Sequence, residues 1–402
     1  MKIVKEKITK DLYVLRIDDD QTSYFESLWD IPEGITYNAY LLATSDKVLL
    51  FDAWKHTFTD LFIEVLKEVV DPRDIDYIII QHMEQDHSGA IPKVLELNGN
   101  RAEVLSHPLS EWMFKSFYGL TPKFRALKDG EEMTLAEKKI RFIFNPWLHW
   151  PETMMSFIPD DGVLLSCDAF GAFSMPLTIF DDDEKIISGY YKHVRKYIVD
   201  IIGHYNEYIL KGVEKLSSQS ISPKVIAPGH GLVFKNNPKL IVDYYSKIAR
   251  GIAEKGKVIV IYDSMYGSVA KGISTAIDEL RKSGANPVVY RFTDVERCNF
   301  SEVVPEIIDS QAMIIGASTY ENDIFPYMRY VLDLIVDKIK VGKPVLTMSS
   351  HGWGGITASR ISKMLGEAGF KAVDSIDFRG QPAENDLERI RKDVGMLLAM
   401  AG

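Results

Sequence analysis

The sequence predicts an α/β protein with two domains, and two observations lead to this fold class. Eight of the nine histidines lie before residue 231, so the two parts of the chain differ in chemistry. Beyond about residue 250, short β-branched runs alternate regularly with helical stretches, which predicts a parallel sheet with helices on both faces. We therefore expect one domain over residues 1–250 and another over 251–402, joined at the polar, glycine-containing stretch 253–257.

Composition argues against several classes of protein. The chain has 402 residues, of which 46% are hydrophobic and 26% charged, enough for cores of ordinary size without disulfides. A formal net charge of −10 argues against nucleic-acid binding, which needs a basic surface. Residues 1–7 are charged and lack an apolar signal core, and no apolar run is long enough to span a bilayer. We expect neither a nucleic-acid partner nor a membrane partner.

The cysteines and the acidic runs are less specific. Cys167 and Cys298 are too few for a zinc ribbon, a rubredoxin centre or a disulfide framework. They favour a reducing, cytoplasmic setting. The acidic runs 18–20 and 181–184 are expected to be solvated loops or turns, with a metal or partner site as the alternative.

The first domain is expected to open with strands over residues 12–17, 37–42 and 48–51. A helix follows over about residues 60–70, with its apolar residues on one face. Residues 76–80 then form a buried strand that runs directly into a group of polar side chains. Residues that follow a buried strand lie at the rim of a sheet, where loops can converge on a site.

That polar group is dense in potential metal ligands. His82, Glu84, Asp86 and His87 lie within six residues. A helix would scatter residues two apart around its circumference, because such residues do not share a face. A loop can direct all four side chains toward one point, so we expect a loop here and a helix beginning at residues 88–90.

Three more candidate ligands lie in turns or after strand-like stretches. His149 is flanked by tryptophans, Asp168 follows the apolar strand 163–167, and His230 lies between two glycines that give the backbone freedom. Four other histidines are expected to be satisfied core or surface residues: His56, His107, His193 and His204.

The second domain opens with a phosphate-binding pattern. A strand over 258–262 is followed by a loop over 263–269 and then by a helix, whose first N–H groups attract phosphate. Ser264 and Ser268 add hydroxyl donors, and Gly267 allows close approach. The loop has no Lys or Arg, and neither the P-loop motif nor the full dinucleotide fingerprint is present. The pattern therefore favours a mononucleotide.

Two further loops are expected at the same edge of this sheet. Strands over 313–315 and 344–347 lead into the polar, glycine-containing stretches 316–322 and 349–355. Trp353 lies among glycines in the second stretch, where an aromatic face could stack on a flat ring. The alternative is an ordinary packed tryptophan.

The seven candidate ligands resemble the signature of the metallo-β-lactamase superfamily, His-x-His-x-Asp-His followed by later His, Asp and His ligands. Glu84 stands where the hydrolases carry their second histidine. A carboxylate makes the site harder and shifts its preference from zinc toward iron or manganese. This glutamate is the pattern of the flavodiiron branch. The three later loops resemble flavodoxins, which hold a phosphate with neutral donors, so both halves resemble the flavodiiron proteins over essentially the whole chain.

The resemblance implies an N-terminal metallo-β-lactamase-like αββα sandwich, followed by a flavodoxin-like, doubly wound, five-stranded parallel sheet. It implies two iron ions, a diiron centre, with one ion held by His82, Glu84 and His149. The other would be held by Asp86, His87 and His230, with Asp168 bridging the pair. Relatives do not all coordinate iron through the residue that matches His87.

The resemblance also assigns FMN contacts and one catalytic residue. Tyr197 matches a tyrosine near the irons and would donate a hydrogen bond to a bound oxygen species; the alternative is an ordinary tyrosine of an amphipathic helix. Many relatives carry a histidine near the position of Phe25 and Glu26, which leaves the preference between gases open. The implied FMN-binding residues are Ser264, Met265, Tyr266, Gly267, Ser268, Ser318, Thr319, Tyr320, Asn322, Ser350, His351, Gly352, Trp353 and Gly354.

The implied activity is that of an oxidoreductase which reduces dioxygen to water, nitric oxide to nitrous oxide, or both, at irons re-reduced by FMN. The alternatives are a metal-dependent hydrolase with an accessory flavin domain and a non-catalytic gas or redox sensor. The electron donor would be a rubredoxin or a reduced deazaflavin coenzyme. A head-to-tail homodimer, or a dimer of dimers, would place one subunit's FMN beside the other's irons. With no rubredoxin or flavin-reductase module after residue 402, the chain resembles the minimal two-domain class.

Overall fold

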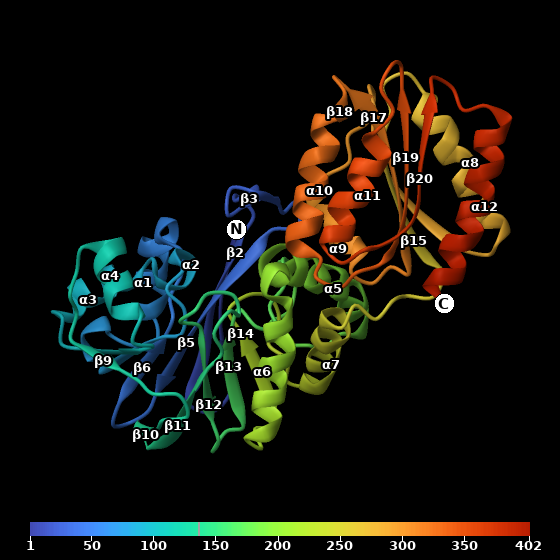
Figure 1. The fold of residues 1–402 in the computed structure, drawn as a ribbon. Helices are drawn as coiled ribbons and strands as arrows, with labels where there is room; N and C mark the ends of the chain where they lie inside the picture. Colours follow the sequence, from blue (N-terminus) through green and yellow to red (C-terminus); the bar gives the residue numbers. More distant parts are fainter. Residues whose placement is uncertain (136) are drawn as a thin grey trace. The chain divides into compact units, whose positions relative to one another are not determined.

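The computed structural model describes residues 1–135 and 137–402, drawn as a ribbon in Figure 1. The described chain forms two compact units. The first comprises Met1–Ile198 and Glu207–Ser246, and the second comprises Val199–Asn206 and Lys247–Gly402. The expected division into domains 1–250 and 251–402 stays a prediction.

Two mixed sheets form the centre of the first unit. The first sheet, in spatial order, consists of β1 (Lys2–Lys7), β2 (Leu12–Asp19), β5 (Ile35–Ala43), β6 (Val48–Phe51), β7 (Tyr77–Ile80), β8 (Glu103–Ser106) and β9 (Phe124–Ala126). The second consists of β10 (Glu132–Leu135), β11 (Lys138–Phe144), β12 (Met154–Ile158), β13 (Val163–Cys167) and β14 (Val225–Pro228). Strands β6 to β9 are parallel, as are β13 and β14, so their carboxyl ends gather at one edge of each sheet.

The two sheets share one apolar core. Alternate residues of each strand point into it, for example Leu12 and Val14 of β2, Leu49 and Phe51 of β6, and Phe142 of β11. Helices lie outside the sheets (Figure 1): α1 (Thr59–Lys67), α3 (Ile91–Asn98) and α4 (Ser110–Tyr118) beside the first, and α6 (Asn206–Ser218) and α7 (Pro238–Ala249) beside the second. The predicted αββα sandwich is confirmed.

A single parallel sheet forms the centre of the second unit. Its order is β16 (Asn286–Phe292), β15 (Lys257–Asp263), β17 (Ala312–Tyr320), β19 (Pro344–His351) and β20 (Lys371–Arg379). Helices α8 (Ser268–Lys282) and α12 (Glu384–Ala401) cover one face, and α9 (Phe300–Ile307), α10 (Pro326–Lys338) and α11 (Thr357–Glu367) cover the other (Figure 1). The predicted doubly wound, five-stranded parallel sheet is confirmed.

Local structure around the ligand motif differs from the expected loop. Helix α2 (Gln85–Ser88) begins inside the motif and carries both Asp86 and His87. The backbone N–H groups of His87 and Ser88 donate to the carbonyl of Glu84, at 3.0 and 2.9 Å, so the chain turns helical directly after Glu84. The expected loop was therefore wrong for residues 85–88, whereas a helix does begin close to the expected residues 88–90, because Ala90 is the N-cap of α3.

The second predicted flavin loop is also more regular than expected. Residues 316–320 belong to strand β17, which turns back at Glu321 and Asn322 into the short antiparallel strand β18 (Asp323–Ile324). Both turn residues have positive φ, 50° and 61°, as a tight hairpin requires. Residues 349–351 likewise continue strand β19.

One acidic run is buried rather than solvated. Asp18 and Asp19 lie in β2, where Asp18 accepts a 2.6 Å bond from the buried guanidinium of Arg16. Asp19 accepts from the hydroxyl of Thr22 at 2.6 Å. The expectation of a solvated loop was therefore wrong for these two residues.

In the described chain no helix is long and apolar enough to cross a membrane.

Candidate metal centre

The seven predicted ligands converge beside the carboxyl ends of β7, β13 and β14. They fall into two groups of side chains that could each hold a metal ion. One group contains His82, Glu84, His149 and Asp168, and the other contains Asp86, His87 and His230. Residues up to 148 positions apart in the sequence therefore meet at one point.

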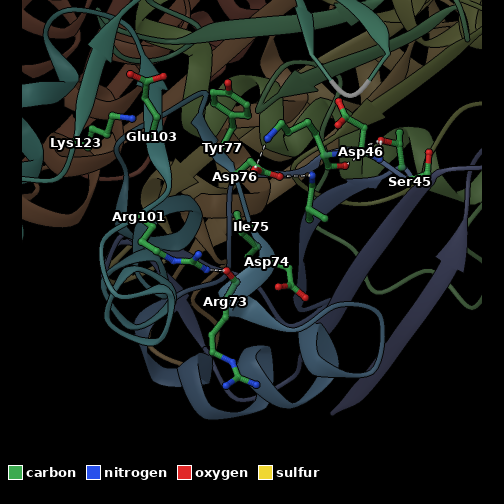
Figure 2. Close-up of a pocket in the computed structure, with 13 residues that line it drawn as sticks. Ser45, Asp46, Arg73, Asp74, Ile75, Asp76, Tyr77, Arg101, Glu103 and Lys123 are labelled. Atoms are coloured by element: carbon green, nitrogen blue, oxygen red, sulfur yellow. Dashed lines mark hydrogen bonds and ion pairs between the residues drawn. The ribbon is translucent and has the colours of Figure 1, made fainter.

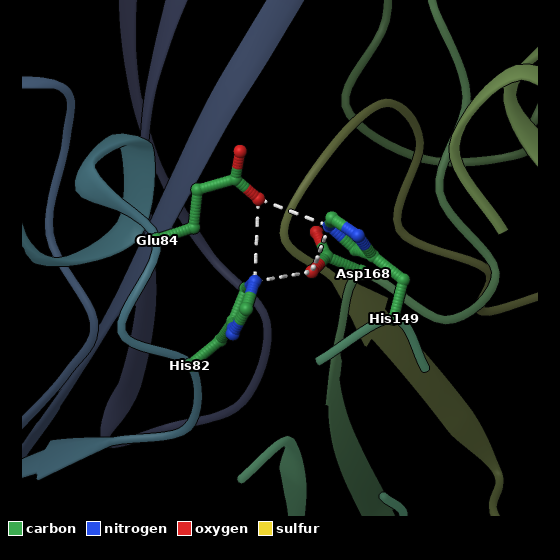
Figure 3. Close-up of side chains that lie close together, drawn as sticks. All are labelled: His82, Glu84, His149 and Asp168. Atoms are coloured by element: carbon green, nitrogen blue, oxygen red, sulfur yellow. Dashed lines mark hydrogen bonds and ion pairs between the residues drawn. The ribbon is translucent and has the colours of Figure 1, made fainter. Parts of the chain in front are cut away.

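The first group is arranged around one oxygen of Glu84 (Figure 3). Glu84 Oε2 lies 2.9 Å from Nε2 of His149 and 3.3 Å from Nε2 of His82. Oδ2 of Asp168 lies 3.5 Å from Nε2 of His82 and 3.7 Å from Nε2 of His149. Two imidazole nitrogens and two carboxylate oxygens thus face one small volume, which suits a single cation.

The second group faces the other oxygen of Asp168. Oδ1 of Asp168 lies 2.9 Å from Nε2 of His87 and 3.2 Å from Nε2 of His230. Asp86 completes this group, with Oδ2 3.4 Å from His230 and Oδ1 3.7 Å from His87. Because its two oxygens face different groups, Asp168 has the orientation of a bridging carboxylate.

Unsatisfied polar atoms in the second group support a bound cation. Asp86 is buried, yet neither of its oxygens forms a hydrogen bond with a described residue. Nε2 of His230 is also without one, since its contacts with Asp86 and Asp168 lack hydrogen-bond geometry. A buried carboxylate without a donor is costly, and a metal ion removes that cost. With three carboxylates beside four imidazoles, the donor set fits iron or manganese better than zinc.

The pKa values show how strongly the site favours positive charge. Burial alone would lower the pKa of His87, but the charges of Asp86 and Asp168 raise it to about 10. Burial likewise opposes ionisation of Glu84, but the hydrogen bonds and charges of His149 and His82 together lower its pKa. The carboxylates therefore stabilise positive charge here, whether it is carried by protons or by metal ions.

Sequence analysis missed a carboxylate behind the first group. Glu152 is wholly buried, and its Oε1 accepts from Nδ1 of His82 at 2.8 Å and from the backbone N–H of Met83 at 3.0 Å. In the second group Nδ1 of His230 contacts a backbone oxygen instead, that of Thr36, at 2.7 Å. The one available signal for Glu152 in the sequence was its position three residues after the candidate ligand His149.

Tyr197, predicted to be catalytic, does reach the cluster. It is the last residue of α5 (Glu184–Tyr197), is wholly buried, and donates from its hydroxyl to Oδ1 of Asp168 at 2.9 Å. Phe25 also lies at the site, with its ring centroid 6.2 Å from that of His230 and 5.4 Å from that of Phe173. An apolar ring therefore occupies a position beside the second group.

A pocket of about 240 Å³ leads to this cluster from the surface of the first unit. Its lining includes Glu84 and Asp86, together with Phe25 and the exposed residues of the hairpin between β3 (Tyr24–Phe25) and β4 (Trp29–Asp30). The pocket gives a small molecule a route to the ligand groups.

A larger pocket of about 560 Å³ lies at the opposite end of the first sheet (Figure 2). It is lined by residues at the amino ends of β6, β7 and β8, among them Lys47, Asp76 and Arg101. Lys47 and Asp76 already form an ion pair at 2.9 Å. None of the seven candidate ligands lines this pocket, so we do not assign the chemistry to it.

The four isolated histidines stay outside both ligand groups, as expected. In the described chain His204 pairs with Asp337 at 2.6 Å, and His193 lies 3.7 Å from a carboxylate oxygen of Glu33. Cys167 and Cys298, by contrast, are both free thiols in the described chain.

The predicted FMN residues gather at the carboxyl ends of three strands in the second unit. Residues 264–268 follow β15, residues 318–322 end β17 and form its turn, and residues 350–354 end β19 and follow it. Two of these segments touch, because a Cβ on Gly354 would lie 2.7 Å from Oδ1 of Asn322. The three segments therefore form one rim.

The first of these segments is shaped to receive a phosphate. Gly267 has a φ of 84°, and Ser264 Oγ accepts from the backbone N–H of Gly267 at 3.2 Å. Two aromatic side chains stand exposed on the rim, Tyr266 at 89% and Trp353 at 79%, as flat surfaces for a ring to stack on. Exposed aromatics beside neutral phosphate donors fit a flavin mononucleotide.

Sequence analysis missed two residues that join the rim together. Asp263 is buried, and its Oδ2 accepts from the backbone N–H of Ser318 at 2.9 Å, which ties the first segment to the second. Its Oδ1 has no hydrogen bond with a described residue. Gln381, after β20, lies 3.3 Å from the hydroxyl of Ser268. A fourth loop therefore reaches the predicted phosphate site.

Comparison with known proteins agrees with this geometry. The family described as "ODP family beta lactamase" matches residues 35–231, and the family described as "Flavodoxin" matches residues 260–392. The nitric oxide reductase of Moorella thermoacetica is 31% identical over 352 residues, covering 87% of this chain and 86% of that protein. The rubredoxin-oxygen oxidoreductase of Megalodesulfovibrio gigas is 29% identical over 363 residues, covering 90% and 89%.

Among solved structures, a variant of the flavo di-iron protein from Thermotoga maritima superimposes with a TM-score of 0.94. It is 42% identical in sequence, and the match covers 100% of both chains. Fold, ligand groups, flavin rim and relatives agree, and the chain belongs to the flavodiiron protein family.

Proposed function

We propose that this chain is an oxidoreductase that reduces dioxygen to water, nitric oxide to nitrous oxide, or both, at two iron ions re-reduced by FMN. Dioxygen reduction consumes four electrons and four protons, and the reduction of two nitric oxide molecules consumes two of each. The two irons and the FMN, when bound, supply the electrons by changing oxidation state. The relatives named as nitric oxide reductase and rubredoxin-oxygen oxidoreductase support both substrates.

One observation carries the proposal. Asp168 directs its two oxygens at two separate groups of ligands, and Glu84 supplies a carboxylate where the related hydrolases carry a histidine. A site with three carboxylates suits iron, and a second unit with a flavin rim has no role in hydrolysis. The metal-dependent hydrolase is therefore not favoured.

For the ligand assignment, His82, Glu84 and His149 would hold one iron, while Asp86, His87 and His230 would hold the other. Asp168 would supply an oxygen to each. The distance of 2.9 Å between His87 Nε2 and Asp168 Oδ1 supports His87 as a ligand rather than as a residue turned away from the site. The four imidazoles and three carboxylates fix the separation and the charge of the two ions.

The FMN contacts are proposed from the rim. Backbone N–H groups of residues 264–268 and the hydroxyls of Ser264 and Ser268 bind the phosphate. Residues 318–322 and 350–354 would hold the isoalloxazine ring, and Trp353 offers an aromatic face on which that ring could stack. The exposure of Trp353 and the contact between Gly354 and Asn322 support this arrangement.

Two residues near the irons are proposed to act on the gas. Tyr197 donates a hydrogen bond to the oxygen of Asp168 that faces His87 and His230, and its hydroxyl would be a hydrogen-bond donor for a gas that reaches this group. Phe25 places an apolar ring in the pocket wall beside His230. It therefore affects which gas enters the pocket and how protons reach the ligand groups.

The electron donor is proposed to be a rubredoxin or a reduced deazaflavin coenzyme, and the name of the Megalodesulfovibrio gigas relative supports a rubredoxin. A head-to-tail homodimer, alone or paired into a dimer of dimers, would bring the FMN of one subunit to the irons of the other. We place the protein in the cytoplasm, and its domain boundary near residue 250.

The test is an anaerobic assay of the reduced, iron- and FMN-loaded protein with dioxygen and nitric oxide supplied separately. We expect consumption of at least one gas with water or nitrous oxide as product. His149→Ala should abolish both activities while FMN stays bound. A protein that purifies colourless and with zinc, and that consumes neither gas, would overturn the proposal in favour of a hydrolase. Binding of nitric oxide without turnover would overturn it in favour of a sensor.

A further inference from the structure

The hydrogen bond between Glu152 and His82 makes the two ligand groups unequal. Glu152 lies just before β12, and its carboxylate reaches across to the loop after β7. A carboxylate can only accept, so His82 must donate its Nδ1–H to Glu152. That tautomer leaves Nε2 of His82 as the nitrogen that faces Glu84 and Asp168.

Glu152 also holds the backbone that carries His82. The same Oε1 accepts from the N–H of Met83, the residue between the ligands His82 and Glu84. Its other oxygen forms no hydrogen bond with a described residue, and the side chain is wholly buried. The charge of Glu152 is therefore screened little by solvent and acts mainly on His82.

In the second group, the histidine nitrogen that points away from the ligands has a different hydrogen-bond partner. His230 Nδ1 donates to the neutral backbone oxygen of Thr36 at 2.7 Å. Asp52 lies close to His87, but both of its oxygens accept from Gln81, through the backbone at 2.8 Å and the side-chain amide at 2.9 Å. Only the first group thus has a carboxylate hydrogen-bonded directly behind a metal-facing histidine, among the described residues.

A carboxylate behind a histidine makes that imidazole a stronger donor to a metal ion and adds negative charge nearby. Both effects stabilise a ferric ion more than a ferrous one. Resting on the proposed function, we propose that Glu152 is a positioning residue for His82 and gives the iron held by His82, Glu84 and His149 the lower reduction potential of the pair. Each iron gains one electron on reduction, and Glu152 keeps its charge throughout.

The glutamine variant separates charge from structure. Glu152→Gln keeps an Oε1 that accepts from His82 and Met83, but it removes the negative charge. Iron content, FMN content and thermal stability should therefore stay near those of the wild type. The preference of the first iron for the ferric state should fall about tenfold, which corresponds to roughly 59 mV for a one-electron couple.

The measurement is a redox titration of the holoenzyme, with the two irons followed by Mössbauer spectroscopy of isotopically enriched protein. In Glu152→Gln we expect the lower of the two iron potentials to rise and the gap between them to narrow. Asp76→Asn serves as the matched control, because it also removes one carboxylate charge from the first unit, but beside the pocket at the opposite end of β7.

Two results would overturn the inference: unchanged potentials in Glu152→Gln relative to Asp76→Asn, or a shift of the higher potential alone. Glu152→Ala adds a second check, since loss of the acceptor should weaken iron binding about tenfold or more, and unchanged binding would contradict the positioning role. A wild-type protein without two redox-active irons would instead defeat the proposed function itself.

Discussion

The hydroxyl of Tyr197 donates a 2.9 Å hydrogen bond to Oδ1 of Asp168, the oxygen that faces His87 and His230. Burial raises the pKa of Tyr197 well above its usual value, and the charge of Asp168 raises it further, so the phenol keeps its proton. A protonated phenol therefore lies beside Asp168, on the side of the second ligand group.

Tyr197→Phe should lower turnover on the order of tenfold while iron and FMN contents stay unchanged, because only a hydrogen-bond donor to Asp168 is lost. Initial rates with each gas, together with metal analysis, measure this. Tyr245→Phe is the control, since that buried hydroxyl donates to the backbone oxygen of Gly171 instead. Equal rates for the two variants would count against a role for Tyr197.

Gly229→Ala should displace His87. A Cβ at residue 229 would lie 2.5 Å from Cε1 of His87, much closer than packed atoms allow. We expect iron content to fall from two ions per chain toward one, with FMN retained, as measured by elemental analysis and flavin absorbance. Gly395→Ala, on an open helical surface with no atom within 4 Å, is the control. Full iron content in Gly229→Ala would argue that His87 is not a ligand.

Stability of the second unit should depend on pH through Asp263. Burial raises the pKa of Asp263 to about 7, although hydrogen bonds from Ser318 oppose the shift. The folded chain therefore keeps a proton that the unfolded chain has already lost. The retained proton adds about 4 kcal/mol to the free energy of unfolding. This contribution is complete below about pH 4 and is lost as the pH rises through about 7.

Asp263→Asn removes this titration but keeps an acceptor for Ser318. Urea unfolding of the FMN-free chain at about pH 5 and about pH 8 should show the wild type losing stability relative to the variant. A constant difference between the two proteins across this range would show that Asp263 ionises normally.

Trp353→Ala should weaken FMN binding about fivefold, because a stacked aromatic contributes roughly 1 kcal/mol. Quenching of FMN fluorescence on titration into the FMN-free protein measures the dissociation constant. Trp112→Ala, a 55% exposed tryptophan on α4 of the first unit, is the control. If both variants bind FMN as the wild type does, Trp353 does not stack on the ring.

Strands buried between layers were the most predictable elements. The apolar runs 48–51 and 163–167 coincide with β6 and β13, since a strand covered on both sides leaves a continuous apolar signature. The hairpin between β17 and β18 was missed, because its turn residues, Glu321 and Asn322, are not the usual glycines.

Burial of charged residues was harder to predict from the sequence. Asp18 is buried because Arg16 pairs with it while donating to the backbone oxygens of Thr178 and Pro176, some 160 residues away. Such partners leave no local pattern, so an acidic run looked like a solvated turn.

For the site, the sequence by itself determined the donor types, their places after strands and the carboxylate at Glu84, because these depend on side-chain chemistry and local spacing. Only the tertiary structure decided which oxygen of Asp168 faces which group, and that Glu152 stands behind His82 from 70 residues away. The physical reason is that both relationships arise where loops from two packed sheets meet, and the orientation of each side chain there depends on the other sheet.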